Sequence, residues 1–182
     1  MSHAGRALID PFSIFTKIGL TKGMKVADMG CGRTGHFVFP AARIVGETGI
    51  VYAVDILKDV LESISSWVRT QALSNVQVIW SDIEMVNKTP IPPKSLDMCF
   101  FMNVLCGLKN KPGALLEASR LLKDDGQIVI VDWSKRLGTL GPSDDAIVDP
   151  KKLTETADEC GLKLVKEILV SDYHYCLIFK KI

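Results

Sequence analysis

The stretch that decides the fold is Val26-Ala27-Asp28-Met29-Gly30-Cys31-Gly32-Arg33-Thr34-Gly35. It starts as an apolar run, turns at closely spaced glycines, and leads into the apolar segment 37–45. Gly30 and Gly32 let the backbone turn sharply and let a ligand approach without meeting a Cβ atom. We therefore predict a buried strand, a ligand-binding turn and a helix with Pro40 in its first turn, whose free N–H groups face the ligand.

Similar apolar runs recur along the chain and predict further strands. Each is rich in Val, Ile or aromatic residues and is apolar almost throughout, which is typical of strands covered on both faces in a parallel sheet. The predicted strands cover residues 25–29, 50–54, 76–80, 96–101 and 127–131.

The segments between these runs have helical spacing. Apolar residues recur three and four positions apart in 60–72 and 114–122. Asp149 and Pro150 read as the N-cap and first residue of a further helix that stops at Gly161. The alternation of strands and helices predicts an α/β fold with a mostly parallel sheet.

The C-terminal region departs from this alternation. Two strand-like runs, 162–170 and 173–180, are separated only by Ser171-Asp172. No crossover helix fits between them, so they are expected to pair antiparallel as a hairpin. The sequence therefore predicts a parallel sheet with one reversed edge strand.

Polar residues follow three of the predicted strands at the edge where a ligand would bind. Asp55 comes about 20 residues after Gly35, where a carboxylate can accept hydrogen bonds from both hydroxyls of a ribose. A helix N-cap is the alternative role for Asp55. Asp82 is placed to accept from an adenine amino group, or to act as a turn residue. Asn103 is placed either to line the ligand crevice or to serve in the core.

Composition excludes several classes of function. The chain has 182 residues with 22 basic and 21 acidic side chains, which argues against extensive nucleic-acid binding. Its five cysteines are odd in number and have no C-x-x-C spacing, so we predict no disulfide framework and no metal site. No apolar run reaches the length of a membrane span, and no signal-peptide layout is present, so we predict a cytoplasmic protein.

Together these motifs resemble the class I methyltransferases that depend on S-adenosylmethionine (SAM). The likeness is closest to the small-molecule branch that includes ubiquinone/menaquinone-biosynthesis-type enzymes, and it extends from Gly19 to the C-terminus. It implies one SAM-binding domain over residues 1–182, with 1–18 as a helical lead-in. It also implies a Rossmann-like doubly wound sheet of seven strands, mostly parallel, with an antiparallel C-terminal hairpin strand.

The resemblance implies cofactor-binding roles, with SAM as methyl donor and S-adenosylhomocysteine (SAH) as product. The methionine part would be held by the glycine loop, the ribose by the residues after the second strand, and the adenine by those after the third. The implied residues are Asp28, Gly30, Cys31, Gly32, Gly35, Asp55, Ile56, Asp82, Ile83 and Asn103.

Two features depart from the family pattern. Thr34 stands where the family has the third glycine of its loop, and Gly35 follows it, which gives the spacing of dinucleotide-binding loops. Cys106-Gly107 stands where this branch often has a histidine pair. Two alternatives therefore stay open: a non-catalytic SAM-binding subunit or sensor, and an NAD-dependent oxidoreductase.

No residue is identified as catalytic. His36 is interpreted as part of a packed helix start, and His174 as a structural or surface residue. Asp132 and Trp133 follow the fifth strand and are placed to line an acceptor pocket. Because little chain is left to cover the site, we expect a small-molecule acceptor; a large partner that supplies its own lid is the alternative. The sequence does not indicate the oligomeric state.

Overall fold

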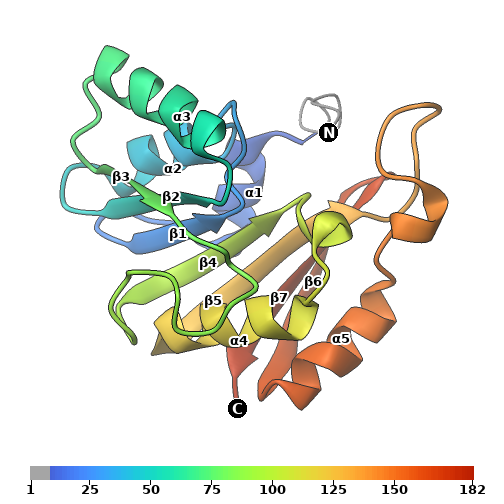
Figure 1. The fold of residues 1–182 in the computed structure, drawn as a ribbon. Coiled ribbons are helices and arrows are strands. Elements are labelled where there is room, and N and C mark those ends of the chain that lie inside the picture. The colour runs from blue at the N-terminus through green and yellow to red at the C-terminus, as the bar shows by residue number, and fades with distance from the viewer. Residues whose placement is uncertain (1–8) are drawn as a thin grey trace.

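The computed structural model describes residues 9–182 and contains a seven-stranded sheet in the order β3-β2-β1-β4-β5-β7-β6 (Figure 1). The first five strands are parallel to one another, so the predicted Rossmann-like α/β fold is confirmed. The strands are β1 (Lys25–Met29), β2 (Ile50–Asp55), β3 (Val76–Trp80), β4 (Leu96–Met102), β5 (Leu122–Trp133), β6 (Leu162–Ser171) and β7 (His174–Lys181).

Helices cover both faces of this sheet (Figure 1). One face packs against α1 (Pro11–Ile18), α2 (Val38–Val45) and α3 (Lys58–Thr70), and the other against α4 (Lys111–Leu121) and α5 (Pro150–Glu159). The hydrophobic core accordingly has two halves, one on each side of the sheet.

The central strands are buried on both faces, as their continuous apolar composition predicts. In β1, Val26 packs into the half of the core under α1 to α3, and Ala27 packs into the half under α4 and α5. Phe100 and Phe101 of β4 divide in the same way, because successive side chains of a strand point to opposite faces.

The helix boundaries follow the sequence signals closely. The Asp149 side chain caps α5 by accepting a hydrogen bond from the backbone N–H of Lys151 at 2.8 Å, and Pro150 is the first helical residue. The helix ends at Glu159, and Gly161 adopts a φ of 74° just beyond it. Pro40 lies in the first turn of α2, as predicted.

The C-terminal hairpin forms, but the prediction that its reversed strand lies at the sheet edge is wrong. β7 is the reversed strand, and it pairs antiparallel with β5 on one side and with β6 on the other. Burial explains the order: β7 is buried from His174 to Phe179, whereas β6 has mostly exposed or half-buried side chains and occupies the edge.

The N-terminal lead-in is helical over Pro11–Ile18, and residues 1–8 lie outside the described part. Its apolar residues Ile14, Phe15 and Ile18 are buried, and the Phe15 ring lies 5.3 Å from that of Phe100 in β4. Phe12 is exposed. This apolar face of α1 therefore packs onto the sheet.

Within residues 9–182, no helix has both the length and the apolar character needed to cross a membrane.

Candidate functional site

The glycine loop leaves the carboxyl end of β1 and passes over the neighbouring strand β2. Gly30, Gly32 and Gly35 have φ values of 82°, 63° and 56°, in the left-handed region that favours glycine. A Cβ atom on Gly30 would come within 2.5 Å of a methyl carbon of Val104, the residue that follows β4 and Asn103. The tight loop therefore needs glycine for both conformation and space.

Four backbone N–H groups of the loop donate to acceptors within the protein. Gly30 and Cys31 both donate to the Val54 carbonyl, at 2.8 and 3.0 Å. Gly32 donates to Oδ2 of Asp55 at 3.0 Å, and Gly35 donates to the carbonyl of Gly32 at 3.3 Å. These four N–H groups are therefore not available to a ligand as a set of free amide donors.

The backbone N–H groups at the start of α2 also differ from the prediction that they are free to face a ligand. The helix begins at Val38, three residues after Gly35, and the side chains of Phe37 to Phe39 are buried in the core. The Phe39 N–H donates to the Gly35 carbonyl at 3.1 Å. The expectation of free helix N–H groups facing a ligand is therefore not met at Phe39, because bulky apolar residues draw the helix start into the core.

Asp28 and Asp55 place two carboxyl groups beside the loop. Asp28 lies in β1 two residues before Gly30 and is 2% exposed. Asp55 ends β2 and is also buried; its Oδ1 accepts from the Leu57 N–H at 3.0 Å while its Oδ2 accepts from Gly32. The N-cap role considered for Asp55 is not observed, because the N-cap of α3 is Leu57.

Trp80 is a residue of this region that the sequence reading did not single out. It ends β3, and its indole N–H donates to the Ile56 carbonyl at 2.9 Å. The bond fixes the turn after β2 from the side of β3. The signal that was available is the position of Trp80, the last residue of a strand whose neighbour ends in Asp55.

The residues after β3 form the far end of the same edge. Oδ1 of Asp82 accepts a hydrogen bond from the Glu84 N–H at 2.9 Å. This is the bond expected of a turn residue, one of the two roles considered for Asp82. Ile83 is buried in the core, whereas Ile56 is half exposed. The apolar surface available to a ligand here is thus mainly that of Ile56.

Asn103 directly follows β4 and has a left-handed conformation with a φ of 55°. Its backbone N–H donates to the Val131 carbonyl at 2.7 Å. Both polar atoms of its side-chain amide are buried, and neither has a hydrogen-bond partner among the described residues. A buried amide without partners is costly, so this side chain is suited to bind a polar ligand group.

Asp132 is the penultimate residue of β5 and is almost fully buried. Its carboxylate accepts from the N–H groups of Leu105, at 3.0 Å, and Trp133, at 2.8 Å. Burial raises its pKa to about 6, although these hydrogen bonds act in the opposite direction. Asp132 thus holds the short 3₁₀ turn Leu105–Gly107 against the end of β5.

Cys106, in that turn, is not an activated thiol. Burial, with a smaller contribution from the Asp132 charge, raises its pKa to about 11, so the thiol stays protonated at neutral pH. It borders a cavity of about 480 Å³ that lies between this turn and α5. Among residues 9–182, no group of three or more His, Cys, Asp or Glu side chains has the arrangement of a metal site.

The two described histidines have different surroundings. His36 bonds the Ile9 carbonyl through Nε2 at 2.9 Å and packs edge-on against Phe37, in agreement with the packed helix start. His174 is 1% exposed, so it is not a surface residue. Burial lowers its pKa to about 4, which keeps the ring neutral at pH 7.

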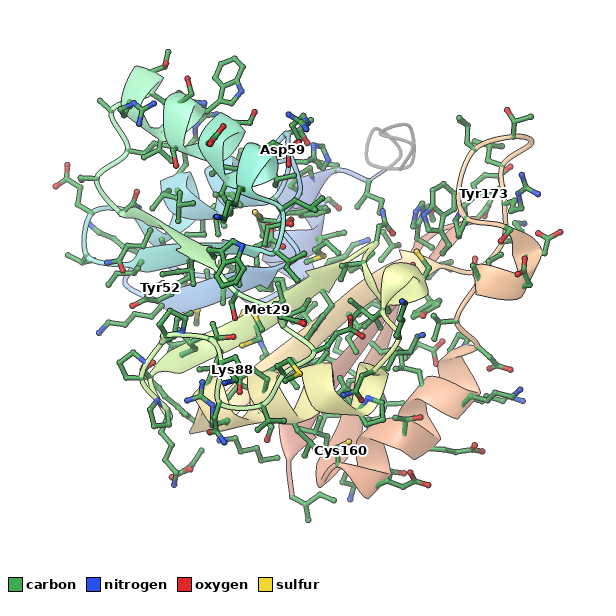
Figure 2. The ribbon with its side chains drawn as sticks, in the orientation of Figure 1. Met29, Tyr52, Asp59, Lys88, Cys160 and Tyr173 are labelled. Atoms are coloured by element: carbon green, nitrogen blue, oxygen red, sulfur yellow. The ribbon has the colours of Figure 1, made fainter. Side chains whose placement is uncertain are left out.

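The candidate site is therefore a row of residues along the carboxyl ends of four neighbouring strands. β3, β2, β1 and β4 are consecutive in the sheet, and each ends in one of the predicted groups. The fold brings together the glycine loop, Asp55, Asp82 and Asn103 at this edge. In Figure 2, Met29 marks the end of β1 within this row.

Comparison with known proteins gives the family. Residues 20–178 match the family model described as a methyltransferase domain. Aklanonic acid methyltransferase DauC from Streptomyces sp. (strain C5) is 32% identical over 136 residues, which is 74% of this chain and 57% of that protein. The ubiquinone/menaquinone biosynthesis C-methyltransferase UbiE from Shewanella pealeana is 31% identical over 118 residues, 64% of this chain and 45% of that protein.

The fold is shared along its whole length with solved structures. A SAM-dependent methyltransferase from Aquifex aeolicus superposes with a TM-score of 0.89 at 24% identity, over 100% of this chain and 94% of that one. By contrast, the chain spans about half the length of the curated relatives described above. With the family model matched over residues 20–178, the chain belongs to the methyltransferase domain family.

Proposed function

We propose that this protein transfers a methyl group from SAM to a small-molecule acceptor. The observation that carries the proposal is the hydrogen bonding of the glycine loop. A dinucleotide needs free amide donors for its pyrophosphate, and the N–H groups of Gly30, Cys31, Gly32 and Gly35 already donate within the protein. The loop offers carbonyl oxygens instead, which suit the ammonium group and the sulfonium of SAM.

The charges along the edge support the same ligand. Asp28, Asp55 and Asp82 supply three carboxyl groups, which complement a cofactor with positive charge at its methionine end and hydroxyl and amino donors elsewhere. Arg33, the cationic residue within the glycine loop, is paired with Asp59 of α3. The edge is therefore better suited to SAM than to the two phosphates of NAD.

The residues present fit SAM part by part. Asn103, whose buried amide has no hydrogen-bond partner within the described part of the chain, would hold the methionine group together with Asp28 and the glycine loop. Asp55 would hold the ribose hydroxyls with the lone pairs that Gly32 and Leu57 leave available. The remaining implied contacts, to the adenine, would come from Ile56, Asp82 and Ile83.

SAM supplies both an electrophilic methyl group and its own leaving group. The work left to the protein is to orient the acceptor in line with the methyl group and to exclude water. A fixed nucleophile or a low-pKa thiol is not required, which agrees with the protonated Cys106.

A small acceptor is supported by the names of the relatives, which act on aklanonic acid and in ubiquinone and menaquinone biosynthesis. The test is a transfer assay in which the protein is incubated with SAM carrying a tritium-labelled methyl group and with a panel of phenols and quinols. We expect label in the organic extract that depends on the protein and is strongly reduced in Asp55→Asn. Tight SAM binding with no label transferred to any panel member would instead indicate a binding protein without turnover.

A further inference from the structure

His174 has one ring nitrogen without a hydrogen-bond partner among residues 9–182. Nδ1 lies 3.2 Å from the Ser171 hydroxyl, whereas Nε2 is buried and makes no hydrogen bond to any described residue. The side chain is 1% exposed, so water does not replace the missing partner from bulk solvent. A buried polar atom without a partner is unfavourable, and a ligand that forms the missing hydrogen bond would remove that cost.

The strand register gives the direction in which Nε2 faces. His174 of β7 lies opposite Ser171 of β6 on one side and opposite Trp133 of β5 on the other. Since Nδ1 faces Ser171, the opposite side of the ring faces β5. Nε2 is therefore directed toward the centre of the carboxyl edge, where β5, β4 and β1 follow one another.

His174 also lies on the same face of the sheet as the glycine loop. The strand neighbours Val131 and Cys176, two residues from Trp133 and His174, belong to the half of the core that includes Cys31 of the loop. β1 and β7 are three strand spacings apart, which is about 15 Å.

The wall beside Nε2 is aromatic. The Trp133 indole lies 4.3 Å from the His174 ring, centroid to centroid. Gly141 lies close against the same indole, since a Cβ atom on Gly141 would come within 3.1 Å of it. An apolar planar group would find contact area on Trp133 once Gly141 moves away.

The segment that carries Gly141 has little burial of its own. None of residues 134–148 is buried, although Val148 packs against the core and Gly141 covers the buried Trp133 indole. It is attached at its start, where the Ser134 N–H donates to the Tyr173 carbonyl at 2.8 Å and Lys135 lies over the Tyr173 ring. Figure 2 shows Tyr173 at the hairpin end beside this segment, and Cys160 at the opposite end of the sheet.

We propose that His174 Nε2 binds an oxygen substituent of the methyl acceptor, which packs against Trp133 beneath the segment 134–148. The assignment rests on the proposed methyl transfer and names the acceptor class: an apolar, planar molecule with a hydroxyl or carbonyl oxygen. The neutral imidazole ring can bind either a hydroxyl or a carbonyl oxygen. If Ser171 donates to Nδ1, Nε2 carries the proton and binds a carbonyl; if Nδ1 donates, Nε2 accepts from a hydroxyl.

The test compares matched probes that differ only in oxygen. Protein labelled with ¹⁵N-histidine and saturated with SAH is titrated with 2-naphthol, 1-tetralone and naphthalene, and the imidazole signals of His174 are followed by NMR. We expect 2-naphthol or 1-tetralone to bind at least about ten-fold more tightly than naphthalene, with a shift of the His174 Nε2 resonance. The probe that binds more tightly identifies the tautomer.

Two variants separate recognition from structure. His174→Phe keeps a ring and removes Nε2. We expect it to bind SAH normally but to lose the oxygen preference, that is, the tighter binding of 2-naphthol or 1-tetralone relative to naphthalene. Tyr175→Phe is the matched control. It removes a neighbouring buried hydroxyl that also has no hydrogen-bond partner in residues 9–182 and that faces the opposite half of the core. Its oxygen preference should be that of the wild type. If His174→Phe does not fold, His174→Gln takes its place, with a weakened preference expected.

Two results distinguish this assignment from the proposed function. An oxygen preference that is absent in the wild type, or unchanged in the His174 variants with SAH bound, would overturn the role of His174 alone. Failure of the wild type to bind SAH would overturn the proposed function, and the acceptor assignment with it.

Discussion

Oδ2 of Asp55 accepts a hydrogen bond from the Gly32 N–H at 3.0 Å, so the carboxylate that ends β2 holds the glycine loop that follows β1. Its Oδ1 holds the Leu57 N–H in the turn before α3. One side chain thus joins two segments of the proposed cofactor site, and its loss should affect both the affinity for the cofactor and the order of the loop.

Asp55→Asn should weaken SAH binding about 10- to 100-fold, because a neutral amide loses the charged hydrogen bonds to the ribose and to one of the two backbone donors. Calorimetric titration of both proteins with SAH measures the change. Asp59→Asn is the control, since Asp59 is an exposed carboxylate of α3 that pairs with Arg33, and it should bind as the wild type does. Equal affinities for the wild type and Asp55→Asn would contradict the ribose assignment.

Asp82→Ala should weaken SAH binding less than Asp55→Asn, by about 5- to 10-fold. Only one hydrogen bond to the cofactor is expected from Asp82, while its Oδ1 already serves the Glu84 N–H. The same titration gives the order of the two effects. A larger loss for Asp82→Ala than for Asp55→Asn would mean that the adenine end, and not the ribose, dominates recognition.

Gly30→Ala should lower the free energy of unfolding by about 2–4 kcal/mol, since it combines a φ of 82° with a contact of 2.5 Å to Val104. Gly138→Ala is the matched control: Gly138 has a φ of 58°, and a Cβ atom there meets nothing within 4 Å. It should cost only about 1–2 kcal/mol. Urea unfolding of both variants tests the difference, and equal losses would show that the contact with Val104 is easily relieved.

Glu117→Gln should destabilise the protein by about 3–5 kcal/mol at pH 7. The carboxylate is fully buried in α4, pairs with Arg120, and accepts from the N–H groups of Asn87 and Thr89. Burial alone would raise its pKa, but these bonds lower it to about 2.

The pH dependence of the Glu117 contribution follows from that lowered pKa. The stabilisation relative to Glu117→Gln should be complete above about pH 4.5 and should be lost as the pH falls toward 2. Unfolding curves of both proteins across this range measure it. A stability difference that does not change with pH would contradict an ionised Glu117.

Asp132→Asn should show the opposite dependence on pH. Because burial raises the pKa of Asp132 to about 6, the native state holds a proton that the unfolded state has released between about pH 4 and 6. The stability of the wild type relative to Asp132→Asn should therefore fall as the pH rises through this window. Unfolding at several pH values checks the sign, and a rise over the same window would mean that the bonds from Leu105 and Trp133 outweigh burial.

Most of the fold was predictable because the strands are apolar throughout and the helices have clear end signals. The β1 and β3 boundaries match the predicted ranges, and the N-cap at Asp149 and the stop at Gly161 are where the sequence indicated. The position of β7 was not predictable from local pattern, because pairing between distant strands depends on burial across the whole sheet.

The candidate site was predictable in part. Strand ends that meet at one edge follow from topology, so the glycine loop, Asp55, Asp82 and Asn103 could be placed together. The partners of each hydrogen bond could not: Trp80 holds Ile56, and the loop amides are already satisfied, only because of the folded geometry. For His174 the prediction left a structural and a surface position open, although its alternation with Cys176 and Ile178 placed it on the inward face of β7.

The most direct test of the central claim is a calorimetric titration of the protein with SAM, SAH and NAD in turn. The glycine loop with engaged amides and the three carboxyl groups beside it predict micromolar binding of SAM and SAH and no binding of NAD. Binding of NAD without SAM or SAH would contradict the proposal, because it would require the loop to release its internal hydrogen bonds for a pyrophosphate.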